Sequence, residues 1–513
     1  MKKILKSCAA IVLAFVCFFG FAACGTKLSE TTVSTSKVLV SNGKSTNAGM
    51  TVVHNGYLYF INGSKTNDGS NLKDNTVAAI CRVKYNESTG KITSSTYEVV
   101  VDSLVGFEDG SLYVFGDFLY YATPSADVNS QDTVLYSKTK FMRYDLVNKK
   151  SYELYTTKLN DSSETLVYTY YVVGDSLNLV VYESVSATIT SLKINKKVTT
   201  NYVIDGVTSC VMSENFGKTA LASDKVDANS YVFYTKAYSG YSEPYRDGVK
   251  VYRVSPVNKN TVHCLSNEGK QISLLTIRNG KLFYSMQSSI TSNSIVYCQK
   301  ITGATNEKLG FADNEFNYNS YADEIFIENE DGSVSLLYLD PTSYELFIIE
   351  KNAEGNSTTT ILNKFTKPSS SGSSSSQEDT FAMIGLATIN EVIKEDNPAT
   401  EDVNEEKKAD ITYLVVMDNS LLYKVEIART VDGVKTLSEK ASIIQLSNTK
   451  FIMPTTSSLL IPEIIDNYVY AMAKELDDQN KETGNTYLYR ADISVKETTK
   501  VGASHIGIEE PEE

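Results

Sequence analysis

Histidine and cysteine are the residues of this sequence whose chemistry depends most clearly on spacing. The histidines stand at positions 54, 263 and 505, and the cysteines beyond residue 23 stand at 24, 81, 210, 264 and 298. Zinc sites take such ligands in pairs separated by a few residues, and this sequence has no such pattern. We therefore expect no metal site and no cofactor.

The four cysteines after Cys24 are expected to be free. Cys81 and Cys298 take equivalent strand positions in different repeats, where they cannot easily meet, so buried apolar thiols are favoured. Cys210 and Cys264 fall in one repeat, but on its first and last predicted strands. A disulfide between them remains the alternative.

Gly174-Asp175-Ser176-Leu177 resembles the opening motif of a serine hydrolase family. That family also needs an Asp-x-x-His pair to supply the base that activates the serine. The residues three places before the three histidines are Thr51, Asn260 and Gly502, so the pair is missing. The motif instead aligns with GDFL at 116–119, which predicts a turn between two strands. We assign no catalytic residue.

Two loops rich in Asp and Asn, NDGSNLKDN (67–75) and DDQNKETGN (477–485), could hold Ca²⁺. Neither has the calcium-loop pattern, in which a glycine directly follows the third ligand. Solvated turns are the favoured interpretation.

One loop has a composition suited to binding. YSGYSEPYRDGVK (238–250) combines Tyr238, Tyr241 and Tyr245 with Arg246. Rigid amphipathic rings and a planar donor are enriched at interfaces and stack on sugars or peptides. These four residues are the predicted ligand-binding residues, and the alternative is that the rings only cover strand ends.

The elements that would position these residues repeat along the chain. NGYLYF (55–60) has counterparts at 116–121, 174–181, 229–234, 279–284, 323–327 and 466–471, with an eighth at 411–417. A second motif follows each one: AICRV (79–83), FMRYD (141–145), TSLKI (190–194), VYRV (251–254), VYCQKI (296–301), LLYLD (336–340), LLYKV (421–425) and LYRAD (488–492). The repeats therefore number eight.

Each repeat can be divided into four strands. In the third repeat they are 164–173, 176–182, 187–194 and 198–204. Antiparallel four-stranded units recurring about every 50–60 residues, without helical periodicity, are typical of a β-propeller. We predict an all-β chain with a single propeller of eight blades. Seven is the alternative, because the repeat near 380–450 is the least regular.

The repeats also resemble the Tyr-rich propeller repeats of extracytoplasmic bacterial lipoproteins. That family carries a "G-D/N-x-Ile/Leu-Tyr-Tyr … Leu-Tyr-Arg-Ile" pattern, and the chain has 34 Tyr and no Trp. The absence of Trp excludes the Trp-bearing signatures of WD repeats and quinoprotein-like propellers. The resemblance supports the fold far better than a function.

The loops predict two different ends of the propeller. First-to-second and third-to-fourth turns are mostly short, whereas several second-to-third loops are long: 63–76, 123–138, 235–248 and 473–485. The long loops share one end with the crossings between blades, and variable loops on a rigid scaffold commonly bind ligands. The acidic insertion at 390–410, in which we find no strand pattern, is the exception at the other end.

The N-terminus predicts an anchor. Lys2, Lys3 and Lys6 precede a short apolar stretch that ends in Phe21-Ala22-Ala23-Cys24. About a dozen apolar residues are too few to span a bilayer, so this is an export signal. It resembles the lipobox of bacterial lipoproteins, with Phe21 in place of the usual Leu. The resemblance implies cleavage before Cys24 and lipidation of its thiol.

These features give the predicted domain organisation. Residues 1–23 are the signal peptide, 24–46 the lipidated Cys24 and a flexible tether, and 47–505 the propeller. The propeller includes a Ser-rich linker at 367–379 and the insertion at 390–410, and 506–513 is an acidic tail. A short strand at 37–41 interrupts the tether.

Charge and anchor together narrow the function. The net charge is −14, and no basic stripe with interleaved aromatic residues is present, so no nucleic-acid partner is expected. We predict a bacterial protein held to the cell membrane on its extracytoplasmic face through Cys24. One face of its propeller would bind an unknown envelope protein, peptide or polysaccharide. Two alternatives are a propeller glycoside hydrolase or lyase with carboxylates around the channel, and a structural role in an envelope complex.

Overall fold

The computed structural model describes residues 40–501 with gaps. The longest gaps are 67–74, 102–110, 158–164, 213–231, 239–247, 265–271, 309–317, 366–380, 396–404 and 453–461. The elements of the described part are β-strands, as the composition predicts. None of its segments is a helix of the length and apolarity needed to cross a membrane.

Eight antiparallel sheets follow one another along the chain, and each forms one blade. Blade 1 contains β3 (Thr51–His54), β4 (Tyr57–Ile61), β7 (Ile80–Asn86) and β8 (Lys91–Val101). Blade 2 contains β9 (Tyr113–Phe115), β10 (Phe118–Val128), β11 (Val134–Asp145) and β12 (Lys150–Thr156). Blade 3 contains β13 (Leu166–Val173), β14 (Ser176–Glu183), β15 (Thr188–Ile194) and β16 (Thr199–Asp205). Blade 4 contains β17 (Ser209–Met212), β18 (Val232–Ala237), β19 (Val249–Val254) and β20 (His263–Cys264).

The second half of the chain continues the same pattern. Blade 5 contains β21 (Ile272–Arg278), β22 (Lys281–Gln287), β23 (Ser294–Lys300) and β24 (Asn306–Lys308). Blade 6 contains β25 (Asp323–Glu328), β26 (Val334–Leu339), β27 (Glu345–Lys351) and β28 (Ser357–Lys364). Blade 7 contains β29 (Phe381–Glu395), β30 (Glu405–Asp418), β31 (Leu421–Val431) and β32 (Val434–Leu437), with β33 (Ile443–Gln445) also on β31. Blade 8 contains β34 (Glu463–Ile465), β35 (Tyr468–Leu476), β36 (Glu482–Asp492) and β37 (Thr498–Lys500).

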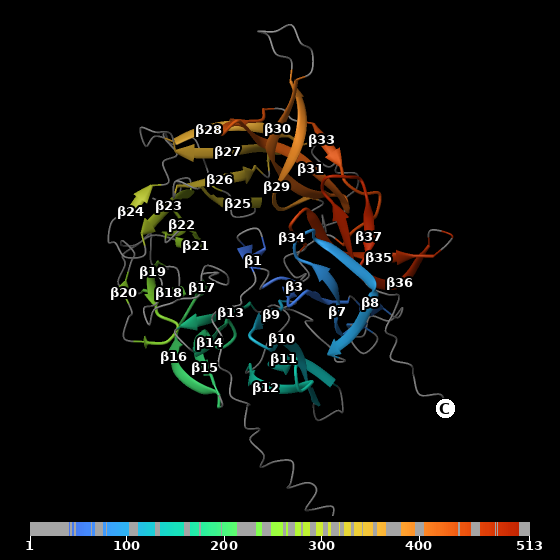
Figure 1. The fold of residues 1–513 in the computed structure, drawn as a ribbon. Helices are drawn as coiled ribbons and strands as arrows, with labels where there is room; N and C mark the ends of the chain where they lie inside the picture. Colours follow the sequence, from blue (N-terminus) through green and yellow to red (C-terminus); the bar gives the residue numbers. More distant parts are fainter. Residues whose placement is uncertain are drawn as a thin grey trace, which may run out of the picture.

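The blades form a ring, so the protein is an eight-bladed β-propeller. In Figure 1 the first strands of the blades surround the middle of the ring, and the fourth strands lie on its rim. A small hairpin of β1 (Val40–Ser41) and β2 (Lys44–Ser45) precedes blade 1. The prediction of eight blades is confirmed, and the irregular region near 380–450 is blade 7.

The hydrophobic core is divided among the spaces between neighbouring blades. One cluster, for example, joins Phe115 and Tyr120 of blade 2 to Leu179 of blade 3, and another joins Tyr182 of blade 3 to Val232 of blade 4. Successive side chains of a strand point to opposite faces, so each inner strand supplies two junctions. This explains why strands such as β14 and β26 are buried along nearly their whole length.

The repeated Tyr and Arg residues of the two motifs form one unit in three blades. In blade 1 the Arg82 guanidinium lies 4.3 Å from the Tyr57 ring centroid and donates to the Tyr59 hydroxyl at 3.1 Å. Arg143 stacks on Phe118 at 4.3 Å in blade 2, and Arg490 on Tyr468 at 4.2 Å in blade 8. A cation over an aromatic ring stabilises the second and third strands against each other. The motif therefore reflects packing within a blade.

Two sequence-based assignments are wrong by a strand or by a residue. DEIFI at 323–327 falls in β25, the first strand of blade 6, whereas the prediction made it the second. Cys298 pairs with Phe283, the place that Arg82 has opposite Tyr59, whereas Cys81 pairs with Phe60. The two cysteines are thus one position apart in register and lie on opposite faces of their blades.

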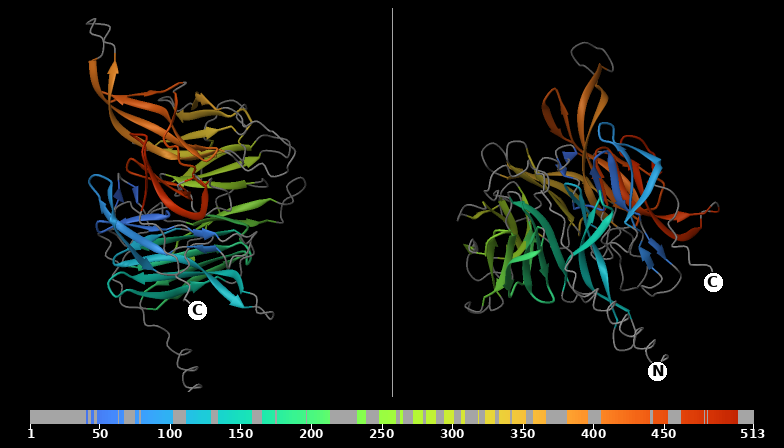
Figure 2. Two further views of the ribbon diagram at one scale, coloured as in Figure 1. Left: turned by 90° about the vertical axis from the view of Figure 1, so that its right-hand side faces the viewer. Right: turned by 60° about the horizontal axis from the view of Figure 1, so that its bottom comes forward.

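The acidic insertion at 390–410 contains strand, contrary to the prediction. β29 and β30 remain paired from Asn390 opposite Asp410 to Glu395 opposite Glu405. Lys394 is the backbone partner of Glu406 within this pairing. This extended hairpin, which we call the arm, projects beyond the rest of the ring in Figures 1 and 2.

The long second-to-third loops are also partly strand. β10 and β11 continue to Val128 and from Val134, which covers most of the predicted loop 123–138. The loop at 63–76 contains β5 (Ser64–Thr66) and β6 (Asn75–Val77), and β5 pairs with β36 of blade 8. These hairpins extend the end of the propeller opposite the arm.

The ring closes between blades 8 and 1, where the β5–β6 hairpin from the loop of blade 1 joins the sheet of blade 8 through β36. We call the contacts between these two blades the closing junction. The Tyr85 hydroxyl donates to Asp466 Oδ2 at 2.5 Å, and Arg490 Nη1 donates to the Gly90 carbonyl at 2.8 Å. Thr51 Oγ1 donates to Glu463, whose carboxyl group lies where a side chain at residue 49 would have its Cβ. Gly49 therefore makes room for this contact.

Candidate ligand-binding site

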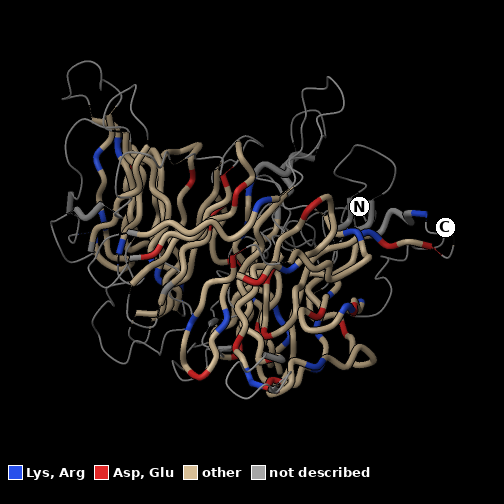
Figure 3. Tube along the Cα trace, turned by 90° about the horizontal axis from the view of Figure 1, so that it is seen from above, with Lys and Arg blue, Asp and Glu red and all other residues tan. Residues whose placement is uncertain are grey.

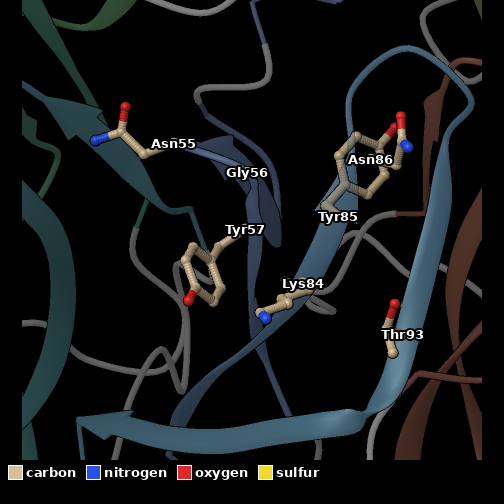
Figure 4. Close-up of a pocket in the computed structure, with 7 residues that line it drawn as sticks. All are labelled: Asn55, Gly56, Tyr57, Lys84, Tyr85, Asn86 and Thr93. Carbon is tan, nitrogen blue, oxygen red and sulfur yellow. The ribbon is translucent and has the colours of Figure 1, made fainter.

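A pocket of about 440 Å³ lies beside the turns of blade 1. Its lining consists of Asn55, Gly56, Tyr57, Lys84, Tyr85, Asn86 and Thr93, as drawn in Figure 4. We call it the blade 1 hollow. The residues come from the turn between β3 and β4 and from the hairpin of β7 and β8, so the hollow is at the same end of the propeller as the arm. Its volume is in the range of small-molecule sites.

The local sequence determines the shape of one wall. Asn55 and Gly56 have φ values of 49° and 74°, the combination of a type I′ turn. The Gly56 amide donates to Glu87 Oε1 at 2.9 Å, and its carbonyl accepts from the Tyr85 amide at 2.9 Å. The Asn-Gly turn is thereby fixed against the end of β7.

The opposite wall depends on an irregularity in the β7–β8 pairing. The register shifts between Arg82 and Lys84, and the Lys84 amide donates to Thr96 Oγ1 at 2.8 Å. A bulge of this kind bends a strand and redirects its side chains. In Figure 4 the Lys84 side chain extends toward Tyr57, and Thr93 stands on the neighbouring strand.

Two polar groups of the hollow, on Lys84 and Tyr57, are available to a ligand, whereas Tyr85, Asn86 and Asn55 already have partners. Among the described residues, no hydrogen bond or ion pair involves Lys84 Nζ or the Tyr57 hydroxyl. Lys84 and Thr93 are exposed, and Tyr57 is half-buried. Arg82 lies over the Tyr57 ring and also pairs with Glu98, which keeps the ring in place. The hollow thus combines a cation, hydroxyl groups, amides and an aromatic ring.

The position of Lys84 holds a different residue in blades 2 and 8. Lys84 pairs with Tyr57, and the corresponding pairs are Asp145 with Phe118 and Asp492 with Tyr468. These aspartates accept backbone hydrogen bonds from the following turns, at 2.8 Å from Asn148 and 2.7 Å from Ser494. In blade 1 the corresponding bonds go to Asn86, two residues later. Lys84 is therefore not needed to cap its own turn.

The predicted ligand-binding loop is only partly described. Tyr238 follows β18, and its amide donates to the Gly248 carbonyl at 3.0 Å. Lys250 Nζ lies 3.6 Å from the Tyr238 ring centroid, which joins the two ends of the loop. Tyr241, Tyr245 and Arg246 lie outside the described residues, as does Cys24. Their predicted roles stay predictions.

The other residues with possible chemistry have structural partners. Ser176 begins β14 and donates to the Val173 carbonyl at 2.9 Å, as expected for a turn between strands. Asp477 Oδ1 accepts from the amides of Gln479 and Lys481 at 2.9 and 2.8 Å, so this acidic loop is a capped turn. No cluster of three or more possible metal ligands occurs within the described residues.

The cysteines do not form the alternative disulfide. Cys210 on β17 and Cys264 on β20 belong to opposite edge strands of blade 4. Three strand spacings separate them, about 14 Å, which is twice the reach of a disulfide. Cys81, Cys210 and Cys298 are buried free thiols, and burial raises the pKa of Cys210.

Sequence reasoning did not find the blade 1 hollow. A usable signal was present, because a lysine replaces the aspartate found in two sister repeats. The sequence prediction placed ligand binding in a long loop and did not consider Lys84, which lies within a regular strand.

Comparison with known proteins identifies no family. No protein-family model matches the sequence, and no curated protein matches it. Among solved structures, one from a study of two prolyl endopeptidases is 9% identical, covering 77% of this chain and 50% of that chain, with a TM-score of 0.39. Oligopeptidase B from Trypanosoma brucei is 12% identical, covering 77% and 48%, with a TM-score of 0.41.

A third similar structure consists of a propeller domain. The β-propeller domain of the trilobed protease from Pyrococcus furiosus is 10% identical, covers 76% of this chain and 95% of that chain, and has a TM-score of 0.37. The present chain spans about half the length of the prolyl endopeptidase and oligopeptidase B chains. These similarities assign neither a family nor a function to this chain.

Proposed function

We propose that this protein is a lipid-anchored binding propeller that engages a protein, peptide or polysaccharide at the bacterial envelope through one face. The observation that carries the proposal is the blade 1 hollow, an open pocket of about 440 Å³ with polar groups on a rigid scaffold. The arm rises from the same end of the ring. Both elements are accessible to a large partner.

The anchor in this proposal is Cys24. The lysines before the apolar stretch and the Ala22-Ala23-Cys24 ending support export and lipidation. Two or three acyl chains hold a protein firmly, because each buried methylene contributes about 0.8 kcal/mol. Incorporation of an alkyne-labelled palmitate, absent in Cys24→Ala, is the expected result. Equal labelling of that variant would contradict the anchor.

A hydrolase with carboxylates around the channel is the alternative, and the two inner-strand glutamates with raised pKa values do not favour it. Glu463 on β34 accepts a hydrogen bond from Thr51, and its pKa is raised to about 8 by burial. Glu324 on β25 lies beside Tyr318, and burial raises its pKa to about 7. The Glu463 carboxyl group contacts blade 1, and the Glu324 carboxyl group bonds to Tyr318 in the segment before β25.

The test uses the full chain in detergent. The protein is applied to arrays of cell-wall fragments, polysaccharides and peptides. Each ligand that binds is then incubated with the protein and analysed for cleavage. Saturable binding without cleavage is the expected result, and a hundredfold excess of a true ligand over its dissociation constant should add about 2.7 kcal/mol to stability. Cleavage of any bound polysaccharide would overturn the proposal in favour of the hydrolase.

A further inference from the structure

We propose that the blade 1 hollow binds a carboxylate-bearing sugar unit, such as a uronic acid or the lactyl ether of a muramic acid. This inference rests on the proposed binding function and assigns a ligand class to that same site. Two parts of the ligand are recognised separately, its carboxylate and its hydroxylated ring.

The carboxylate is recognised by Lys84. Its ammonium group has no acidic partner among the described residues, although the chain as a whole carries a net charge of −14. Figure 3 shows acidic and basic residues interspersed along the described chain. A charge-assisted hydrogen bond to a carboxylate is stronger than a neutral one.

The aspartates of the sister blades support this assignment. In two other blades this position holds an acid that caps a turn, Asp145 and Asp492, whereas blade 5 has Lys300 there. With Lys84, blade 1 has the opposite charge in the same place, and Asn86 takes over the capping. The change reverses the charge at this one position, and the turn remains capped.

The sugar ring is recognised by Tyr57 and the neutral polar groups. Arg82 holds the Tyr57 ring in place at 4.3 Å, which leaves the half-exposed side chain fixed before a ligand arrives. Fixed aromatic groups lose little conformational entropy on binding. Thr93 and Asn55 line the same space and can bond ring hydroxyl groups.

The shape of the pocket favours one or two units of a longer chain. The hollow has about 440 Å³ and is open to solvent. A bound unit can therefore continue into a polymer on either side. This arrangement suits recognition of a polysaccharide better than capture of an isolated metabolite.

The test measures calorimetric binding of the full chain in detergent to four probes. These are a short galacturonate oligomer, a muramic-acid-containing wall fragment, a neutral galactose oligomer of equal length, and acetate. We expect the uronate, the muramic acid fragment or both to bind, and the first two arms distinguish the sources. Added salt should weaken the binding because an exposed ion pair is screened.

The variants locate the site. Lys84→Gln should weaken binding about tenfold, whereas Lys91→Gln, which removes an exposed lysine from the same hairpin, should leave it unchanged. Tyr57→Phe should weaken it by a smaller factor, because only the hydroxyl is lost. Unchanged thermal stability of all three shows that the fold is intact.

Several outcomes would overturn the inference. Equal binding of the neutral oligomer, or binding insensitive to Lys84→Gln, would contradict the ligand class or the place, while leaving the proposed function intact. If none of the four probes binds and a peptide on the array does, the ligand class is contradicted and the proposed function stays intact. Cleavage of the uronate oligomer would instead contradict the proposed function.

Discussion

The closing junction and the junction between blades 2 and 3 join similar sheets by different means. Blades 2 and 3 are consecutive along the chain, and aromatic rings fill the space between them, with Tyr113 and Tyr170 centroids 4.8 Å apart. Blades 8 and 1 come from opposite ends of the sequence, and Arg490 and Gly90 are 400 residues apart. Polar contacts there supplement a core that continues through blade 1 into blade 2.

The difference shows that ring closure in this propeller relies on side-chain contacts together with the β5–β36 strand pairing. Blade 1 is complete with residues near the start of the propeller and blade 8 with residues near its end. Besides the short β5–β36 pairing, the closing junction has Met472 and Leu488 buried against the blade 1 side of the same cluster. We infer that it is as tightly packed as a junction between consecutive blades.

The largest expected effect comes from truncating one buried leucine at each junction, which tests whether the two junctions are equally tightly packed. Leu488→Ala at the closing junction and Leu179→Ala between blades 2 and 3 both truncate fully buried leucines, at 1% and 0% exposure. Each should lower the free energy of unfolding by about 2–5 kcal/mol, because a cavity is left behind. Urea denaturation of both variants measures the comparison. A cost for Leu488→Ala less than half that of Leu179→Ala would show that the closing junction is loosely packed.

The next effect is the change of stability with pH that results from titration of Glu463 and Glu324. Burial raises the pKa of Glu463 from 4.5 to about 8 and that of Glu324 from 4.5 to about 7. Each folded carboxyl group holds its proton at pH values where the unfolded one has lost it, so stability falls as pH rises from about 4.5 to the folded pKa. Each contribution should be about 1–2 kcal/mol after allowance for solvent screening.

Replacement of each glutamate by glutamine distinguishes the contributions of Glu463 and Glu324 to the pH dependence of stability. Glu463→Gln should stabilise the protein relative to the wild type at pH 8.5, and the difference should shrink below about pH 5. Glu324→Gln should behave in the same way, with its change complete about one pH unit lower. Melting temperatures across this pH range measure both. A Glu463→Gln difference that does not depend on pH would contradict the enclosed, protonated carboxyl group.

A smaller effect concerns the space at Gly49. Gly49→Ala should cost about 1–2 kcal/mol, because its Cβ displaces the Glu463 carboxyl group from Thr51. The control is Gly433→Ala, where φ is +80° and no atom lies within 4 Å, so only backbone strain of about 1 kcal/mol is expected. Combining Gly49→Ala with Glu463→Ala should remove most of the first cost. Simple additivity of the two changes would contradict the contact.

The smallest effect belongs to the junction between blades 2 and 3. The Tyr170 hydroxyl is buried and has no hydrogen-bond partner among the described residues, and burial raises the pKa of the phenol. Tyr170→Phe should therefore change stability by less than about 0.5 kcal/mol or increase it. A loss above about 1 kcal/mol, measured by urea denaturation, would show that the hydroxyl has a bonding partner such as a buried water.

The regular parts of the fold were predictable because they follow local periodicity. In blade 3 the predicted and observed strands agree within two residues at every end. Asn-Gly and Gly-Asp turns between alternating strands specify hairpins through the backbone angles they allow. The errors arose where this signal is ambiguous. DEIFI in blade 6 alternates as a second strand does, and nothing local gives its position in the sheet.

The candidate site was less predictable than the fold. The hollow depends on the bulge between Arg82 and Lys84, and a shift of one residue determines which face a side chain occupies. The same sensitivity placed Cys298 in the position that Arg82 has in blade 1. Pairing register depends on contacts between strands, so the order of residues along one strand does not determine it.

The sequence by itself determined the repeat, the four-stranded unit and the number of blades, because each depends on residues near one another in the chain. Only the tertiary structure decided how blade 8 meets blade 1, where Glu463 meets Thr51 across 412 positions. It also decided that the acidic insertion forms an arm and that Lys84 lies beside Tyr57 at the edge of a hollow. These features depend on which residues the closed ring brings together. The separation of two residues along the sequence does not indicate how far apart they lie in the folded ring.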